Sequence, residues 1–208
     1  FISTPFSRQA ANDLSEINLP AFKIGSGECN NYPLLKHISK IKKPIVLSTG
    51  MNDIKSIKKS VSILSKNKIQ YALLHCTNLY PTLPKQMRLN GILELKNIFP
   101  KAVIGYSDHS GSNLSSLTAV ALGASIVEKH FTIDSIKSGP DISSSINEKD
   151  LKKLISDINE IYVSKKGSVK PIKAEKSTAN FAFASVVAIK NIKKGEKISN
   201  KNLWVKRP

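Results

Sequence analysis

Short apolar segments alternate with longer amphipathic segments along most of the chain. The apolar segments have the length of buried β-strands. Between them, residues 54–64 carry apolar side chains at spacings of three and four, which predicts a helix. A second helix is expected after Asn147, a residue type that caps helix N-termini, because residues 151–161 repeat the same spacing. The predicted strands are residues 1–2, 21–24, 44–47, 70–74, 102–104 and 124–127.

This order of strand, helix and short connection is typical of parallel β/α units. Six strands fit a doubly wound sheet, whereas a closed (β/α)8 barrel needs two more, which would precede Phe1. The chain does not begin with methionine, and its first apolar segment starts at residue 1, as if the beginning of that strand were missing. We therefore expect a fragment of an α/β protein from which N-terminal units are missing.

The pattern changes after Ser164. Residues 165–179 are polar, rich in lysine and without periodicity, which predicts a linker between residues 1–164 and residues 180–208. The latter segment contains short β-like runs on either side of the turn KKGE. It is expected to be the beginning of a small second domain.

Polar residues come directly after every predicted strand. Because the carboxyl ends of parallel strands share one edge, these residues should meet there, where barrel and doubly wound enzymes place their chemistry. Hydroxyl, amide and ammonium groups near glycines suit a phosphate or carboxylate, and His109 and His130 on consecutive strands suit a divalent metal. A single Ser or Thr at such a position is usually only a helix cap, and His75 is explained equally well as a core residue. The clusters are 3–4, 23–28, 48–50, 75–78, 107–109 and 128–130.

The composition limits the classes of protein that remain. With 208 residues and 40% hydrophobic content, the chain can form one sizeable core and a small second unit. No apolar run approaches the roughly 18 residues of a membrane span, and no membrane partner is expected. Cys29 and Cys76 form no CxxC pair, so a cytoplasmic location is expected. The net charge of +17 comes mostly from lysines spread over helix surfaces, which leaves nucleic-acid binding as a minor alternative.

Seven motifs occur together in one order: STPF, KIGSGE, PIVLSTGM, LLHCTNLYP, GYSDHSG, GASIVEKHFT and GPD. In this order and spacing the chain resembles, over essentially its whole length, the bacterial N-acetylneuraminate and legionaminic acid synthases of the sialic acid synthase family. Its tail resembles their antifreeze-like (SAF) domain. The resemblance implies a TIM barrel lacking its first two strands, followed by a truncated SAF domain, in a domain-swapped homodimer. The missing strands carry a catalytic glutamate and a lysine in that family, so we expect the fragment to be inactive alone.

The resemblance also implies a reaction. It is the condensation of phosphoenolpyruvate with N-acetylmannosamine, or a related N-acyl hexosamine, to give a nonulosonic (sialic) acid and phosphate, with Mn²⁺ or Mg²⁺. Another phosphoenolpyruvate-dependent aldol-type synthase, such as a pseudaminic acid synthase, remains the alternative. A basic nucleic-acid-binding protein is the alternative from a different class, although no nucleic-acid partner is expected.

Individual positions match the family's functional residues. His109, His130 and Glu28 are the catalytic residues that the resemblance implies, and the two histidines are the metal ligands. Phe181 and Arg207 match SAF-domain residues that reach the partner subunit's active site. The phosphoenolpyruvate-binding positions are Thr4, Lys23, Ser26, Ser48, Asn78 and Ser107, and the sugar-contacting positions are Glu28, Tyr80 and Asp141.

Overall fold

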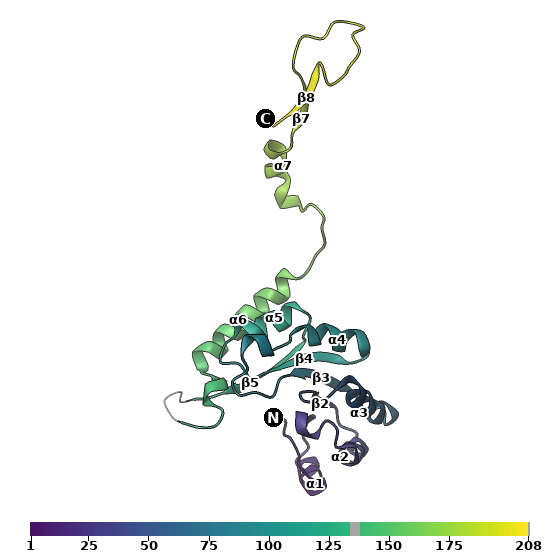
Figure 1. The fold of residues 1–208 in the computed structure, drawn as a ribbon, viewed down its shortest axis with the longest axis vertical. Coiled ribbons are helices and arrows are strands. Elements are labelled where there is room, and N and C mark those ends of the chain that lie inside the picture. Colours follow the sequence, from purple (N-terminus) through teal and green to yellow (C-terminus); the bar gives the residue numbers. More distant parts are fainter. Residues whose placement is uncertain (134–137, 208) are drawn as a thin grey trace. The chain divides into compact units, whose positions relative to one another are not determined.

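A computed structural model describes residues 1–133 and 138–207 (Figure 1). The chain divides into two compact units, Phe1–Lys165 and the remainder from Lys166. Each unit is described by itself. No helix in the described ranges is both long and apolar enough to cross a membrane.

The first unit is built on a six-stranded, entirely parallel sheet in the order β1-β2-β3-β4-β5-β6. Each strand pairs with the next one along the chain, and α-helices lie between successive strands from β1 to β5, as Figure 1 shows for α3, α4 and α5. The arrangement is an open, curled half-barrel of the TIM type. The strands are β1 (Phe22–Ile24), β2 (Ile45–Ser48), β3 (Tyr71–Cys76), β4 (Val103–Asp108), β5 (Ile126–Phe131) and β6 (Ser145–Ile146).

Five of the six predicted strands are confirmed as β1 to β5. The strand predicted at residues 1–2 is wrong: the pairing is one isolated parallel bridge from Ser3 to Phe22. Strand β6 was not predicted, because its two residues include a single apolar side chain, too little to form a recognisable run. The sheet of the first unit has six strands, as predicted, but it lacks the strand predicted at residues 1–2 and includes β6 instead.

Two of the helices begin where a capping residue precedes an apolar repeat. Asp53 accepts a hydrogen bond from the Ser56 backbone N–H at 2.7 Å, and Asn147 accepts one from that of Asp150 at 2.9 Å. Both long helices predicted from periodicity are confirmed, as α3 and α6. The helices of this unit are α1 (Arg8–Glu16), α2 (Tyr32–Ile38), α3 (Ile54–Lys66), α4 (Asn90–Ile98), α5 (Leu114–Ala121) and α6 (Glu148–Ser164), with 3-10 turns η1 (Ser26–Glu28), η2 (Ser39–Ile41), η3 (Pro84–Gln86) and η4 (Ile142–Ser144).

Strand alternation separates the core from the candidate site. Phe22, Leu47, Leu73 and Tyr106 are almost completely buried in a cluster that includes residues of the covering helices. Because successive side chains of a strand point to opposite faces, the residues between them project to the other face of the sheet. Those residues are polar near the carboxyl ends of the strands, as Lys23 next to Phe22 illustrates.

The second unit contains little buried surface. It consists of η5 (Lys173–Glu175), α7 (Lys176–Ala182) and an antiparallel pair formed by β7 (Ser185–Ala188) and β8 (Leu203–Lys206). The range 165–179, predicted to be a linker, contains η5 and the first part of α7. In the described part of this unit Asn202 alone is buried.

Candidate active site

Polar side chains from four strands form a connected cluster on the face opposite the core. The Lys23 ammonium donates a hydrogen bond to Ser48 Oγ at 2.8 Å and lies 3.5 Å from Glu128 Oε1. The Ser107 hydroxyl donates to the same carboxylate oxygen at 2.7 Å. The chain therefore brings together three predicted phosphate-site residues, with a carboxylate among them.

A second group of predicted residues surrounds Gly50, directly after β2. The Gly50 backbone N–H donates to Ser26 Oγ at 3.1 Å. A Cβ atom at Gly50 would lie 1.9 Å from Asn78 Oδ1 and 2.9 Å from Ser26 Oγ, so only glycine allows these side chains to approach so closely. The buried Cys76 thiol interacts with both Ser26 and Ser107 and thus lies between the two groups; burial raises its pKa.

The two predicted metal ligands lie beside this cluster. The rings of His109 and His130 have centroids 5.3 Å apart, inclined at 56°. Tyr80 stacks on His109 at 4.2 Å and meets His130 edge-on at 5.6 Å. The Thr82 backbone N–H donates to the His109 carbonyl at 3.0 Å, which attaches the loop carrying Tyr80 to the end of β4.

Hydrogen bonding determines the tautomer of His109. Its Nδ1 lies 2.8 Å from the carbonyl oxygen of Thr77, which can only accept, so Nδ1 carries the proton and the lone pair is on Nε2. Burial lowers the pKa of this ring, which favours the neutral form. Backbone carbonyls orient metal-binding histidines in this way in many metalloproteins. His109 is thus prepared to act as a ligand through Nε2.

His109 and His130 could supply only part of the coordination shell of a cation. His109 and His130 line a cavity of about 230 Å³ together with Ser107, Asp108, Glu128 and Lys129. Among residues 1–133 and 138–207, no cluster of three or more His, Cys, Asp or Glu is arranged to bind a metal. A divalent ion held by these two imidazoles alone would take its other ligands from water and substrate.

A buried ion pair lies on the other face of the same strand ends. Lys129 Nζ is 2.9 Å from Asp108 Oδ2, and the two side chains are 4% and 0% exposed. Asp108 also accepts hydrogen bonds from the hydroxyls of Ser115 and Ser116 and from the Ser110 backbone N–H, at 2.6–2.8 Å. Burial pushes the pKa of Asp108 upward, but Lys129 and these donors outweigh it and hold the pKa below its usual value. The pair joins the ends of β4 and β5 directly behind the two histidines.

The remaining predicted residues are less closely connected. Glu28, on η1, accepts a hydrogen bond from the Asn31 amide at 2.6 Å, and Thr4 is half-buried beside the bridge to β1. Asp141 Oδ2 lies 3.8 Å from His130 Nδ1. Phe181 and Arg207 lie in the second unit, where the Arg207 Nε–H donates to the Phe181 carbonyl at 3.4 Å.

The set of predicted site residues did not include Glu128. Its carboxylate contacts Lys23 and Ser107, although a carboxylate is an unexpected neighbour for an anion site. The available signal was alternation: Glu128 and His130 are two residues apart on one strand, as are Ser107 and His109, so each pair shares a face.

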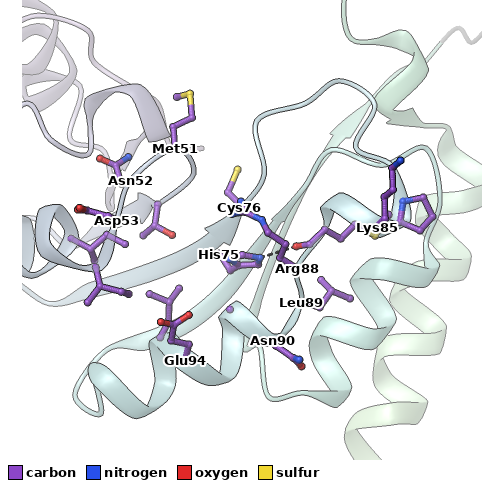
Figure 2. A pocket seen from close by; sticks show the side chains of 17 residues that line it. Met51, Asn52, Asp53, His75, Cys76, Lys85, Arg88, Leu89, Asn90 and Glu94 are labelled. Carbon is purple, nitrogen blue, oxygen red and sulfur yellow. Dashed lines mark hydrogen bonds between the residues drawn. The ribbon is translucent and has the colours of Figure 1, made fainter.

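A larger pocket, of about 1240 Å³, opens between the first turns of α3 and α4 (Figure 2). None of the predicted site residues lines it. His75 does line it: its Nε2 bonds the Met87 carbonyl at 2.9 Å, and burial lowers its pKa. A Cβ on Gly91 would lie 2.6 Å from the His75 ring. The packing role considered for His75 is thus supported.

The sequence of the chain matches a known family. The profile of the NeuB family matches residues 1–170. The chain belongs to the NeuB family. This NeuB chain is 43% identical over 212 residues to N,N'-diacetyllegionaminic acid synthase of Campylobacter jejuni, which covers all of the chain and 63% of the relative. It is 36% identical over 208 residues to the pseudaminic acid synthase of the same organism, covering 99% and 60% respectively.

A solved structure shares the fold. The NeuB chain superimposes on N-acetylneuraminic acid synthetase from Leptospira borgpetersenii, crystallised with citrate, with a TM-score of 0.80 and 35% identity over 86% of the chain and 62% of that protein. The resemblance to the sialic acid synthase family is therefore confirmed, with the family profile matching residues 1–170. The chain spans 60–63% of the length of these three proteins.

Proposed function

We propose that the complete NeuB protein condenses phosphoenolpyruvate with N-acetylmannosamine or a related N-acyl hexosamine, giving a nonulosonic acid and inorganic phosphate. The proposal is carried by one observation, that two groups of polar side chains lie next to each other. The Lys23, Ser48 and Ser107 cluster adjoins the His109–His130 pair, which supports the proposal of an anion pocket beside two imidazoles that would bind a metal.

The anion pocket offers donors of several kinds. The Lys23 ammonium and the Ser48, Ser107 and Ser26 hydroxyls can surround the phosphate and carboxylate of phosphoenolpyruvate, and the Asn78 amide adds two further N–H donors. Thr4, near the bridge to β1, is proposed as a further hydroxyl donor. Bound in this way, the enol phosphate would have its nucleophilic C3 directed at the acceptor.

The acceptor would lie on the histidine side. A Mn²⁺ or Mg²⁺ ion held by His109 and His130 would polarise the aldehyde of the sugar as a Lewis acid. Tyr80 covers the two rings, and the carboxylates of Glu28 and Asp141 would accept hydrogen bonds from sugar hydroxyls. Carbon C3 of phosphoenolpyruvate forms a bond to the aldehyde carbon, water adds at C2, and phosphate leaves as the C–O bond breaks.

The second unit and the assembly are part of the same proposal. We propose that residues 180–208 begin an SAF domain and that, in a domain-swapped homodimer, Phe181 and Arg207 reach the partner subunit's active site. The Arg207 guanidinium carbon lies 5.7 Å from the centre of the Phe181 ring, so the two side chains could act together on a sugar N-acyl group. Both described cysteines are free and buried, which is consistent with the proposed cytoplasmic location.

Phosphate release tests the proposal. The complete protein is incubated with phosphoenolpyruvate, Mn²⁺ and a panel of N-acyl hexosamines, with and without EDTA. We expect release with at least one acceptor and none with EDTA or without acceptor. A preference for the acceptor of pseudaminic acid synthases would favour that alternative. No release with any acceptor, together with salt-sensitive binding to generic DNA, would instead support a nucleic-acid-binding protein.

A further inference from the structure

Glu128 lies between the anion pocket and the two imidazoles. One oxygen of its carboxylate, Oε1, accepts from Ser107 at 2.7 Å and lies 3.5 Å from Lys23 Nζ. Glu128 and His130 share a face of β5, and both line the cavity of about 230 Å³ with His109. The carboxylate is thus next to the positions that we assign to a negative substrate and to a positive ion.

This position has opposite effects on the two ligands. With no ligand bound, Glu128 neutralises Lys23 and accepts the hydrogen bond from Ser107 that a phosphate or carboxylate would need. An entering anion must displace the carboxylate from both groups, because two negative oxygen groups within contact distance repel each other. A cation between His109 and His130 is instead attracted by the same carboxylate.

The side chain can move without disturbing its strand. Glu128 is 39% exposed, so its torsions are not blocked by packing. The neighbouring Lys129 is held on the other face by the buried pair with Asp108. A change in the direction of the carboxylate therefore needs rotation of one side chain, while β5 stays in place.

We propose that Glu128 couples the two halves of the site, keeping anions out of the Lys23–Ser107 pocket until a divalent cation draws its carboxylate away. The inference rests on the proposed function, since it assumes an anionic substrate and a cation at the histidines. Linkage makes the coupling reciprocal: the cation strengthens anion binding by the factor by which the anion strengthens cation binding. The result would be a preferred order, cation first and phosphoenolpyruvate second.

Equilibrium binding to Glu128→Gln tests the coupling without a turnover assay. Calorimetry gives the Kd of inorganic phosphate and of phosphoenolpyruvate for the complete protein, with EDTA and then with saturating Mn²⁺. Electron paramagnetic resonance gives the Kd of Mn²⁺. Glutamine keeps the shape of the side chain but removes the charge. We expect metal-free phosphate binding to become roughly tenfold tighter and Mn²⁺ binding roughly tenfold weaker, a typical size for coupling between sites.

Two further variants complete the experiment. Glu160→Gln makes the same change on the exposed surface of α6 and should leave both Kd values unchanged. Glu128→Asp, which withdraws the carboxylate from Lys23 by one methylene, should also tighten metal-free phosphate binding, and it replaces Glu128→Gln if that variant does not fold. If the Glu128 variant binds phosphate without metal no more tightly than the wild type does, the coupling is refuted. The proposed function would still stand. A wild-type protein that binds neither Mn²⁺ nor phosphoenolpyruvate overturns both the coupling and the proposed function.

Discussion

Replacing Lys129 by methionine tests whether the buried ion pair supports the face of the sheet that carries the candidate site. The substitution keeps the length of the side chain and leaves the Asp108 carboxylate, 0% exposed, without its cation. Removing one partner of a buried pair typically costs about 3–5 kcal/mol. Three donors, from Ser110, Ser115 and Ser116, continue to solvate the carboxylate. We therefore expect a loss at the lower end of that range, about 3 kcal/mol in the free energy of unfolding.

Urea unfolding of the complete protein at pH 7, followed by circular dichroism, measures this loss. Lys153→Met is the matched control, because Lys153 pairs with Asp157 on the exposed surface of α6, where such pairs contribute about 0.5 kcal/mol or less. Adding Asp108→Asn to Lys129→Met should recover part of the stability, since it removes the unpaired charge. A Lys129→Met protein within about 1 kcal/mol of wild type would refute the reasoning.

The pH dependence of the same difference has a definite sign. The pKa of Asp108 is lower in the folded protein than its usual value, so the stabilisation is present above the unfolded pKa of about 3.9. It is lost as the pH falls through the folded pKa. The stability difference between wild type and Lys129→Met should therefore shrink below about pH 4. A difference that stays constant or grows on acidification would contradict the ionised pair.

Three further predictions concern the site and a buried thiol. His109→Ala should abolish Mn²⁺ binding, measured by electron paramagnetic resonance, while the circular dichroism spectrum stays unchanged; normal binding would refute its role as a ligand. Gly50→Ala should raise the KM for phosphoenolpyruvate at least tenfold, because its Cβ would displace the Asn78 amide, whereas Gly25→Ala, whose Cβ meets nothing within 4 Å, should not; equal KM values would contradict this. Burial raises the pKa of Cys29 to about 11, so its thiol should react with Ellman's reagent at pH 8 only after unfolding, and rapid reaction of the folded protein would contradict its burial.

Periodicity was sufficient for most of the fold. Strands β1 to β5 each contain a short apolar segment that is recognisable in the sequence, although Lys23 interrupts β1 and the second half of β5 is mostly polar. Helices α3 and α6 show a helical repeat after a capping residue. The first and last pairings could not be predicted in the same way. The bridge at Ser3 and the two residues of β6 depend on neighbouring strands for their hydrogen bonds, and such tertiary contacts have no local pattern.

The site was predictable to the level of which strand ends contribute to it. Because parallel strands present their carboxyl ends at one edge, Lys23, Ser48 and Ser107 had to lie near one another. The sequence does not reveal which donors and acceptors pair there. The carboxylate of Glu128 within the anion pocket and the Thr77 carbonyl that sets the His109 tautomer both depend on side-chain directions, which only the structure supplies.

The parallel register of β4 and β5 pairs Ser107 with Glu128 and Asp108 with Lys129, one couple on each side of the sheet. A slip of one residue would exchange the faces: Lys129 would point to the face that carries Ser107, and an imidazole would point to the face that carries Asp108. Single-residue insertions or deletions within these strands should therefore be strongly damaging. The Asp108–Lys129 ion pair thus makes a shifted register costly, and it preserves the spacing of the two imidazoles.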